Sequence, residues 1–427
     1  MAHTQHADTD GRIPDPSAGS ELEIRIIETG ERLLAGLSRA VDSVPDSRVG
    51  PQALARRLGL DKVLASRVLK TVRSGDPLAA IHRSPGPEPL RRVVRAMTKA
   101  GVDVQVTDEA SRAIERFERL ISDDIGDRSS LDAILSSWVP EARKEFELRR
   151  KQSAFKALSQ LKGTQADTLM ASVFLAPSDD GTHLDIVWVN GLFGLHRVRP
   201  GAGVKFATRR MSKDEPGRAP RSLDGELVES HADLLLREFC GAAVPSLEVV
   251  RINDAILYTM RENGFGPLSA TDVVFAEVNL REVARYAKPG VKRKSFVFAE
   301  VSSPSKALQF DVFVHESLFI GTEPGIRIYD TSFEGVADPN DPTRELDRLD
   351  MLESVESLGT GISRCRSADI GRYGELLQSV CARLGWDGTR FRGYRCRIDY
   401  PLYGSQVILT WDQTERPGDS SSGEMAR

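Results

Sequence analysis

Two short segments place a carboxylate and an imidazole on one face of a predicted strand. Asp311 precedes His315 by four residues, and His183 precedes Asp185 by two. Side chains two or four positions apart on a strand point to the same side of the sheet, so each pair could orient an imidazole for proton transfer or metal binding. The sequence offers no identifiable third ligand or nucleophile beside either pair. We therefore interpret both pairs as polar strand positions that face solvent.

The sequence motifs of common enzyme classes are missing. There is no GxSxG, no Walker A loop and no GxGxxG, and the aspartates of 338–350 lack the spacing of a calcium loop. No CxxC pair occurs among the four cysteines, which are Cys240, Cys365, Cys381 and Cys396. They predict neither a zinc site nor a disulfide framework. We predict no catalytic residue, no cofactor and no metal ligand, and expect that the chain is not an enzyme.

The stretch PQALARRLGLDKVLASRVLK, residues 51 to 70, has the pattern of two short helices joined by a tight turn. Its inward positions are apolar or small, namely Leu54, Leu58, Leu60, Ala65 and Val68, with Ala55 at the closest approach of the helices. Gly59 would occupy the turn, where the backbone often needs a positive φ. Asp61 would cap the second helix.

The outward face of this second helix has the side chains that bind nucleic acid. Lysine, serine and arginine suit phosphate oxygens and base edges, and arginine can make a bidentate contact with guanine. Gln52, at the start of the first helix, could donate a hydrogen bond to a phosphate. The predicted DNA-binding residues are Gln52, Lys62, Ser66, Arg67, Lys70 and Arg73.

Positive charge is concentrated around the same stretch. From Arg48 to Lys99 there are twelve Lys or Arg residues against three Asp or Glu, a net charge of +9 in a chain whose net charge is −4. Such asymmetry is typical of a module that meets phosphate. A purely structural helix pair would not need it.

Residues 51 to 74 resemble the helix-turn-helix of bacterial transcriptional regulators, most nearly the winged forms of the IclR and MarR types. The resemblance implies that 61–73 is a recognition helix in the major groove of double-stranded DNA. We expect a homodimer, because one such motif reads few base pairs. The two-stranded wing of those families does not follow directly, and only Val102–Val106 alternates as a wing strand would.

Hydrophobic periodicity predicts an α+β fold with several segments. Apolar residues three and four apart indicate helices over most of 22–161, including 51–58, 61–73 and 88–100, whereas short β-branched runs between Gly, Pro and Asp turns follow from about Asp167. The expected order is an all-α helix-turn-helix domain and then a larger β-rich, antiparallel α+β domain. The predicted ranges are a disordered tail (1–19), the DNA-binding domain (20–106), a helical linker or dimerisation element (107–164), a ligand-sensing or assembly domain (165–412) and a second disordered tail (413–427).

Length and composition agree with a cytoplasmic regulator. The 427 residues are 40% hydrophobic and 28% charged, no apolar run approaches the roughly 20 residues that span a bilayer, and the N-terminus has no secretory pattern. We expect a sequence-specific DNA-binding transcriptional regulator, with double-stranded DNA and a small-molecule effector as partners and no membrane. Two alternatives remain open: an enzyme with its chemistry in the β-rich domain, or a protein-interaction scaffold that uses the helix-turn-helix.

Overall fold

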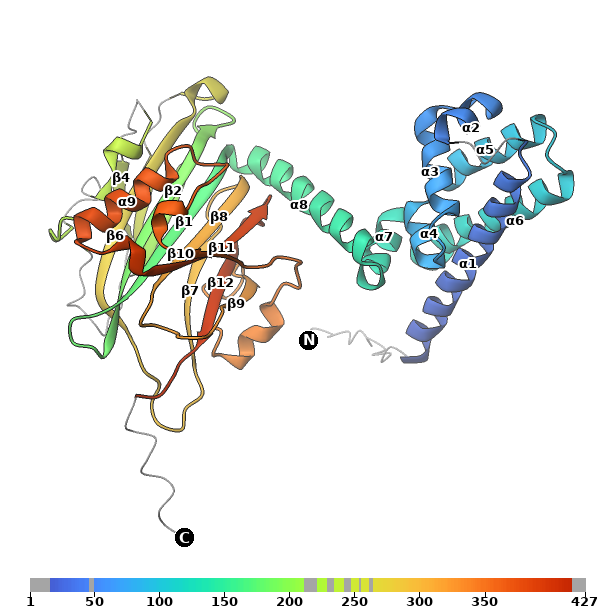
Figure 1. The fold of residues 1–427 in the computed structure, drawn as a ribbon. Coiled ribbons are helices and arrows are strands. Elements are labelled where there is room, and N and C mark those ends of the chain that lie inside the picture. The colour runs from blue at the N-terminus through green and yellow to red at the C-terminus, as the bar shows by residue number, and fades with distance from the viewer. Residues whose placement is uncertain are drawn as a thin grey trace, which may run out of the picture. The chain divides into compact units, whose positions relative to one another are not determined.

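The chain divides into two compact units, Met1–Glu147 (unit 1) and Leu148–Arg427 (unit 2). The computed structural model describes residues 16–45, 50–210, 221–228, 234–241, 247–252, 255–260 and 264–416. Within these residues unit 1 is helical, and unit 2 contains the strands (Figure 1). The fold is therefore α+β, as the sequence predicted.

The helices of unit 1 are short and joined by tight connections. They are α1 (Pro16–Asp42), α2 (Pro51–Leu58), α3 (Lys62–Val72), α4 (Pro77–Arg83), α5 (Pro87–Lys99), α6 (Val104–Arg119), a π-helical turn (Leu120–Ile125) and α7 (Arg128–Trp138). Helix α8 (Pro140–Lys162) continues into unit 2. Several of them begin after an aspartate whose carboxylate accepts a backbone N–H of the first turn, which satisfies a donor that the helix itself cannot. These aspartates are Asp61, Asp76, Asp103 and Asp127.

One hydrophobic core runs through unit 1 from α1 to α7. Leu33 and Leu37 of α1, Val68 of α3 and Phe117 of α6 are all fully buried in it. The core also includes Leu131 and Leu135 of α7. Residues 107–138, part of the range 107–164 that the sequence predicts as a linker or dimerisation element, thus contribute to the same core as α2 and α3.

The strand predicted over Val102–Val106 is wrong. Helix α6 begins at Val104, and the Asp103 carboxylate accepts the Gln105 N–H at 2.7 Å. The burial pattern that follows has a helical period, with Thr107, Ala110, Ala113, Ile114 and Phe117 buried. No strand precedes Thr164 within the part of the chain that the structure describes, so the described residues supply no wing beside the helix pair.

Parts of both predicted tails have defined structure. Helix α1 begins at Pro16, inside the range 1–19. At the other end, the Gln413 N–H donates to Arg293 O, and Glu415 pairs with Ala287. The rest of both tails, residues 1–15 and 417–427, lies outside the described residues, as does Arg48.

Unit 2 is built on one mixed sheet of six strands in the order β10-β11-β8-β1-β2-β6. Strands β1 and β8 pair in parallel, and the other neighbours are antiparallel. Two further sheets have the orders β7-β12-β9 and β3-β5-β4. The bounds are β1 (Thr164–Pro177), β2 (His183–Arg197), β3 (Val204–Arg210), β4 (Leu247–Ile252), β5 (Ala255–Met260), β6 (Thr271–Ala284), β7 (Lys294–Glu300), β8 (Ser305–His315), β9 (Gly325–Asp330), β10 (Glu356–Thr360), β11 (Phe391–Asp399) and β12 (Ser405–Asp412).

The two faces of the six-stranded sheet pack against different partners. On one face, Val312 of β8 shares a core with Leu409 and Trp411 of β12. On the other face, Phe313 packs with Leu377 of α9 (Tyr373–Leu384), the helix that lies over β1 and β2 in Figure 1. Strand β8 is buried on both faces, which explains why apolar residues occupy both of its sides instead of alternating with exposed polar ones. None of the described helices is long and apolar enough to cross a membrane.

Candidate nucleic-acid interface

The turn between α2 and α3 has the geometry that the sequence predicted. Gly59 adopts φ 64°, ψ 34°, a left-handed conformation that costs glycine little. The next N–H, that of Leu60, donates to Ala55 O at 2.9 Å and closes α2. Asp61 then caps α3, with its Oδ1 accepting from Leu64 N at 2.8 Å. The direction of α3 is therefore set by hydrogen bonds within a few residues of the turn.

One side of the α2–α3 pair is buried and the other is open. Ala65 and Val68 are 0% exposed, and Ala55 and Leu58 are also buried. The outward residues of α3 at positions 62, 66, 70 and 73 are three or four apart, so they form a single stripe along the helix. We call this stripe the α3 face; it consists of Lys62, Ser66, Lys70 and Arg73. Ser66 is half-buried and the other three are exposed.

The remaining two predicted residues lie beside this stripe rather than in it. Gln52 is exposed in the first turn of α2. Arg67 is also exposed, and it belongs to the neighbouring row of α3 together with Val63, whose side chain is 70% exposed. The structure thus places all six predicted residues at or near the surface of the helix pair.

The basic residues of the helix pair differ from those of α5 in their ion pairs. Within the described residues, Lys62 and Lys70 of α3 and its C-cap Arg73 form no ion pair. The same holds for Arg56 and Arg57 of α2. On α5 the situation differs. Arg91 bonds to Glu118, and Arg95 bonds to Glu88 at 2.8 Å. The hydrogen bond from Arg95 is the largest cause of a lowered pKa for the exposed Glu88 carboxyl. Part of the +9 region is therefore neutralised, but the positive charge on α2 and α3 is not.

Arg67 has a contact that the sequence did not reveal. Its Nη2 donates to Ser84 O at 3.1 Å, at the end of α4. Arg128 donates to Ile81 O and His82 O at 2.9 and 3.0 Å. Because the last carbonyls of a helix have no partner within it, these two arginines supply the missing donors. The partners are 17 residues apart in one case and 46 to 47 in the other, so no local signal indicates them.

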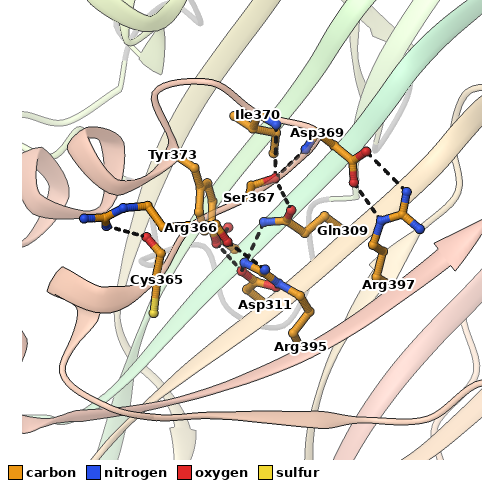
Figure 2. Close-up of polar contacts among 11 residues, drawn as sticks. Gln309, Asp311, Cys365, Arg366, Ser367, Asp369, Ile370, Tyr373, Arg395 and Arg397 are labelled. Carbon is orange, nitrogen blue, oxygen red and sulfur yellow. Dashed lines mark hydrogen bonds and ion pairs between the residues drawn. The ribbon is translucent and has the colours of Figure 1, made fainter.

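Unit 2 holds a buried polar cluster made of Gln309, Asp311, Tyr373 and Arg395, which we call the Asp311 cluster (Figure 2). Asp311 is 0% exposed. Arg395 binds it with two parallel bonds, Nε to Oδ1 at 2.8 Å and Nη2 to Oδ2 at 2.7 Å. The Tyr373 hydroxyl and the Gln309 amide donate to the same Oδ2 at 2.5 and 3.1 Å. This cluster connects β8, β11 and the start of α9.

The chemistry available to the Asp311 cluster is limited by its burial. Burial first, and then the Asp311 charge, raise the pKa of Tyr373 well above its usual value, so the phenol stays protonated and remains a donor. Its oxygen also lies 2.8 Å from Ser172 Oγ on β1. Gln309 Oε1 also accepts from Ser367 Oγ at 2.6 Å, and Arg395 Nη1 donates to Arg366 O at 2.7 Å. The cluster therefore supports a structural role, in which it ties the sheet to α9 and to the loop before it.

The carboxylate–imidazole pairs considered from the sequence make their hydrogen bonds elsewhere. His315 Nδ1 lies 2.9 Å from Ser317 Oγ. Asp311 is fully buried in the cluster above, so its interpretation as a strand position that faces solvent is wrong. His183 bonds to Asp180, and Asp185 accepts from Ser178 at 2.5 Å. Within the described residues no group of three or more His, Cys, Asp or Glu side chains is placed to hold a metal ion.

Comparisons with known proteins give no family for this chain. No protein-family model and no curated protein matches the sequence. A solved structure of a candidate protease from Parabacteroides distasonis aligns with 58% of the chain at 10% identity and a TM-score of 0.24. This chain spans 40% of that protein. A similarity this low supports no statement about fold or activity.

Proposed function

We propose that unit 1 binds double-stranded DNA, with α3 as the recognition helix, and that the protein is a transcriptional regulator. The observation that carries this proposal is the α3 face. It presents three cations without ion pairs in the described residues, on a helix whose opposite side is fully buried. A helix that is packed into the core on one side and carries positive charge on the other suits the major groove.

The positions along α3 suggest how contacts would be divided. Recognition helices read bases mainly with their N-terminal residues, which here are Lys62, Val63 and Ser66. The exposed Val63 side chain suits the methyl group of thymine, and Lys62 and Ser66 suit base-edge acceptors. Lys70 and Arg73 lie at the other end of the helix, where we assign them to phosphates. Gln52 would bond a phosphate from the first turn of α2.

Arg67 takes two roles in this proposal. One N–H holds α3 against the end of α4 through Ser84 O. A guanidinium has five N–H donors, so the others remain for a base edge. We infer that Arg67 fixes the position of the helix and contacts DNA from the same side chain.

The proposal extends to the number of copies that bind DNA and to the role of unit 2. Because one α3 reads only a few base pairs, we propose that two copies of the chain bind one operator. For unit 2 we propose a sensing or assembly role. We propose no catalytic function, since the Asp311 carboxylate is fully buried and is held by hydrogen bonds from Arg395, Tyr373 and Gln309.

The test is enrichment of genomic DNA fragments by the purified full-length protein. Wild type is compared with the triple variant Lys62→Gln, Lys70→Gln and Arg73→Gln. The matched control is Lys288→Gln, Lys292→Gln and Arg364→Gln, which removes the same charge from exposed residues of unit 2. We expect a few fragments to be enriched by wild type and by the control, and none by the triple variant of α3. Equal enrichment by all three proteins, or by none, would overturn the proposal.

A further inference from the structure

A small cavity lies within unit 1 between α1 and the end of α6. Its volume is about 250 Å³, and its lining residues are Arg25, Thr29, Arg116, Arg119, Leu120 and Asp124. We call it the arginine pocket. We propose that the arginine pocket binds a small organic anion, a carboxylate or a phosphate, and that its occupant acts on α3. No residue of the α3 face lines it, so it is a site distinct from the DNA interface.

The charges around the pocket leave a surplus guanidinium. Arg25 pairs with Asp124 at 2.8 Å, and Arg116 pairs with Glu28 at 3.0 Å. Arg119 is exposed and has no ion pair among the described residues. Three guanidinium groups therefore face two carboxylates. The planar fork of a guanidinium matches a carboxylate or a phosphate with two parallel hydrogen bonds, so Arg119 is the residue that we expect to hold the anion.

The helix changes its geometry at the pocket. Helix α6 ends at Arg119, and the chain continues as a π-helical turn over Leu120–Ile125, closed by Gly126 N donating to Ile121 O at 2.8 Å. Two of the lining residues, Leu120 and Asp124, belong to this turn. A π-helical turn is rare and occurs frequently at functional sites. The π-helical turn is therefore a second observation, independent of the surplus guanidinium, and it lies at the same pocket.

The size of the pocket limits its ligand. Ligand cavities usually have volumes of about 300 to 1,000 Å³, and this one lies just under that range. It suits a compact metabolite with one or two anionic groups and is too small for a nucleotide. The side chains of Arg25 and Asp124 are 45% and 26% exposed, so solutes reach the pocket from solvent.

A close contact connects the pocket to the recognition helix. Thr29 lines the pocket, and the next residue, Gly30, packs so tightly on α4 that a Cβ there would lie 2.6 Å from Pro77 O. Pro77 begins α4 four residues after Arg73, the C-cap of α3. A displacement of α1 at Thr29 would therefore press directly on the chain that follows α3. This coupling rests on the proposed DNA-binding function, whereas anion binding by the pocket does not.

Isothermal titration calorimetry of the full-length protein tests the site itself. The probes are succinate and inorganic phosphate, each at constant ionic strength. We expect saturable binding of at least one probe, weakened ten-fold or more by Arg119→Gln. Arg112→Gln, which removes an exposed arginine about two turns earlier on α6, should leave the affinity unchanged. Absence of saturable binding by both probes, or equal affinity in Arg119→Gln and wild type, would overturn the proposal. The probe that binds more tightly identifies the anionic group.

The coupling is tested by repeating the DNA titration with and without the tighter probe at fixed ionic strength. We expect the dissociation constant for DNA to change about five-fold or more, with the reciprocal change in the affinity for the anion. The Arg119→Gln variant should show neither change. If the anion binds but leaves DNA affinity unchanged, the regulatory part is wrong and the binding site stands. If the protein does not bind DNA, the proposed function fails while calorimetry still decides the site.

Discussion

Lys70 is the residue for which a phosphate contact makes the plainest prediction. Its side chain is exposed on the α3 face and has no ion pair in the described residues. Because lysine acts on phosphate as a point charge, Lys70→Ala should weaken binding to all duplexes alike. It should also flatten the slope of log affinity against log salt by about 0.9. Anisotropy titrations at several salt concentrations measure both, with Lys288→Ala as the control. A loss confined to one sequence, or an unchanged slope, would contradict the assignment.

Arg67 should affect folding and specificity together. Removal of its hydrogen bond to Ser84 O should lower the free energy of unfolding by about 0.5–1.5 kcal/mol. Loss of a base contact should cost roughly 1–3 kcal/mol on the preferred sequence and little on random DNA. Thermal melting and sequence selection with Arg67→Ala measure the two effects separately. If this variant melts like wild type and keeps the same sequence preference, Arg67 neither fixes the position of α3 nor contacts a base.

Asp311 should be essential for the stability of unit 2. Asp311→Asn removes the charge of a fully buried carboxylate that pairs with the largely buried Arg395, and we expect a loss of about 3–5 kcal/mol in the free energy of unfolding. The control is Asp369→Asn, which breaks a more exposed pair with Arg397 and should cost at most about 1 kcal/mol. Denaturant titration followed by intrinsic fluorescence compares the two variants. Equal losses would mean that the Asp311 cluster does not stabilise the sheet as described.

The sequence predicted well those helices whose ends are marked by residues in the helix or directly next to it. The bounds of α2 and α3 follow from Pro51, Gly59 and Asp61, which act on their immediate neighbours. The strand over Val102–Val106 was wrong because alternation over five residues does not distinguish a strand from the first turn of a helix. There, the capping Asp103 and the later helical period were the stronger signals.

Contacts between distant elements could not be predicted from the sequence. The bond from Arg67 to Ser84 joins residues whose approach depends on how α3 and α4 pack. Asp311 meets Arg395 because β8 and β11 pair in an antiparallel register that places the two opposite each other. Neither pairing has a local pattern. The sequence therefore indicated the α3 face but neither the support for it at the end of α4 nor the Asp311 cluster.

The packing of α6 and α7 predicts which elements unit 1 needs in order to fold. Phe117, Leu131 and Leu135 are fully buried in the core that α3 shares. A fragment of residues 1–147 should therefore unfold cooperatively on heating, whereas a fragment of residues 1–106 should not fold. Circular dichroism of the two fragments measures this difference. Cooperative melting of the shorter fragment would show that residues 107–138 are dispensable to the helix-turn-helix.

At the scale of the whole molecule, the two units have separate cores and differ in where their main charged groups lie. Unit 1 has cations on α2 and α3 that form no ion pair with the described residues, although the chain as a whole carries a net charge of −4. Unit 2 encloses its most prominent polar cluster. This division is what a regulator requires if one unit meets phosphate and the other senses or assembles, and it is the arrangement that we propose.

The most direct test of the account is the salt dependence of DNA affinity for the full-length protein. We predict a linear fall of log affinity with log salt between about 50 and 200 mM, with a slope of about −0.9 for each phosphate contacted. The Lys62→Gln, Lys70→Gln and Arg73→Gln variant should have a clearly flatter slope, and the charge-matched variant of unit 2 the wild-type slope. An affinity that does not change with salt, or a slope equally steep in all three proteins, would contradict the claim that the α3 face binds DNA.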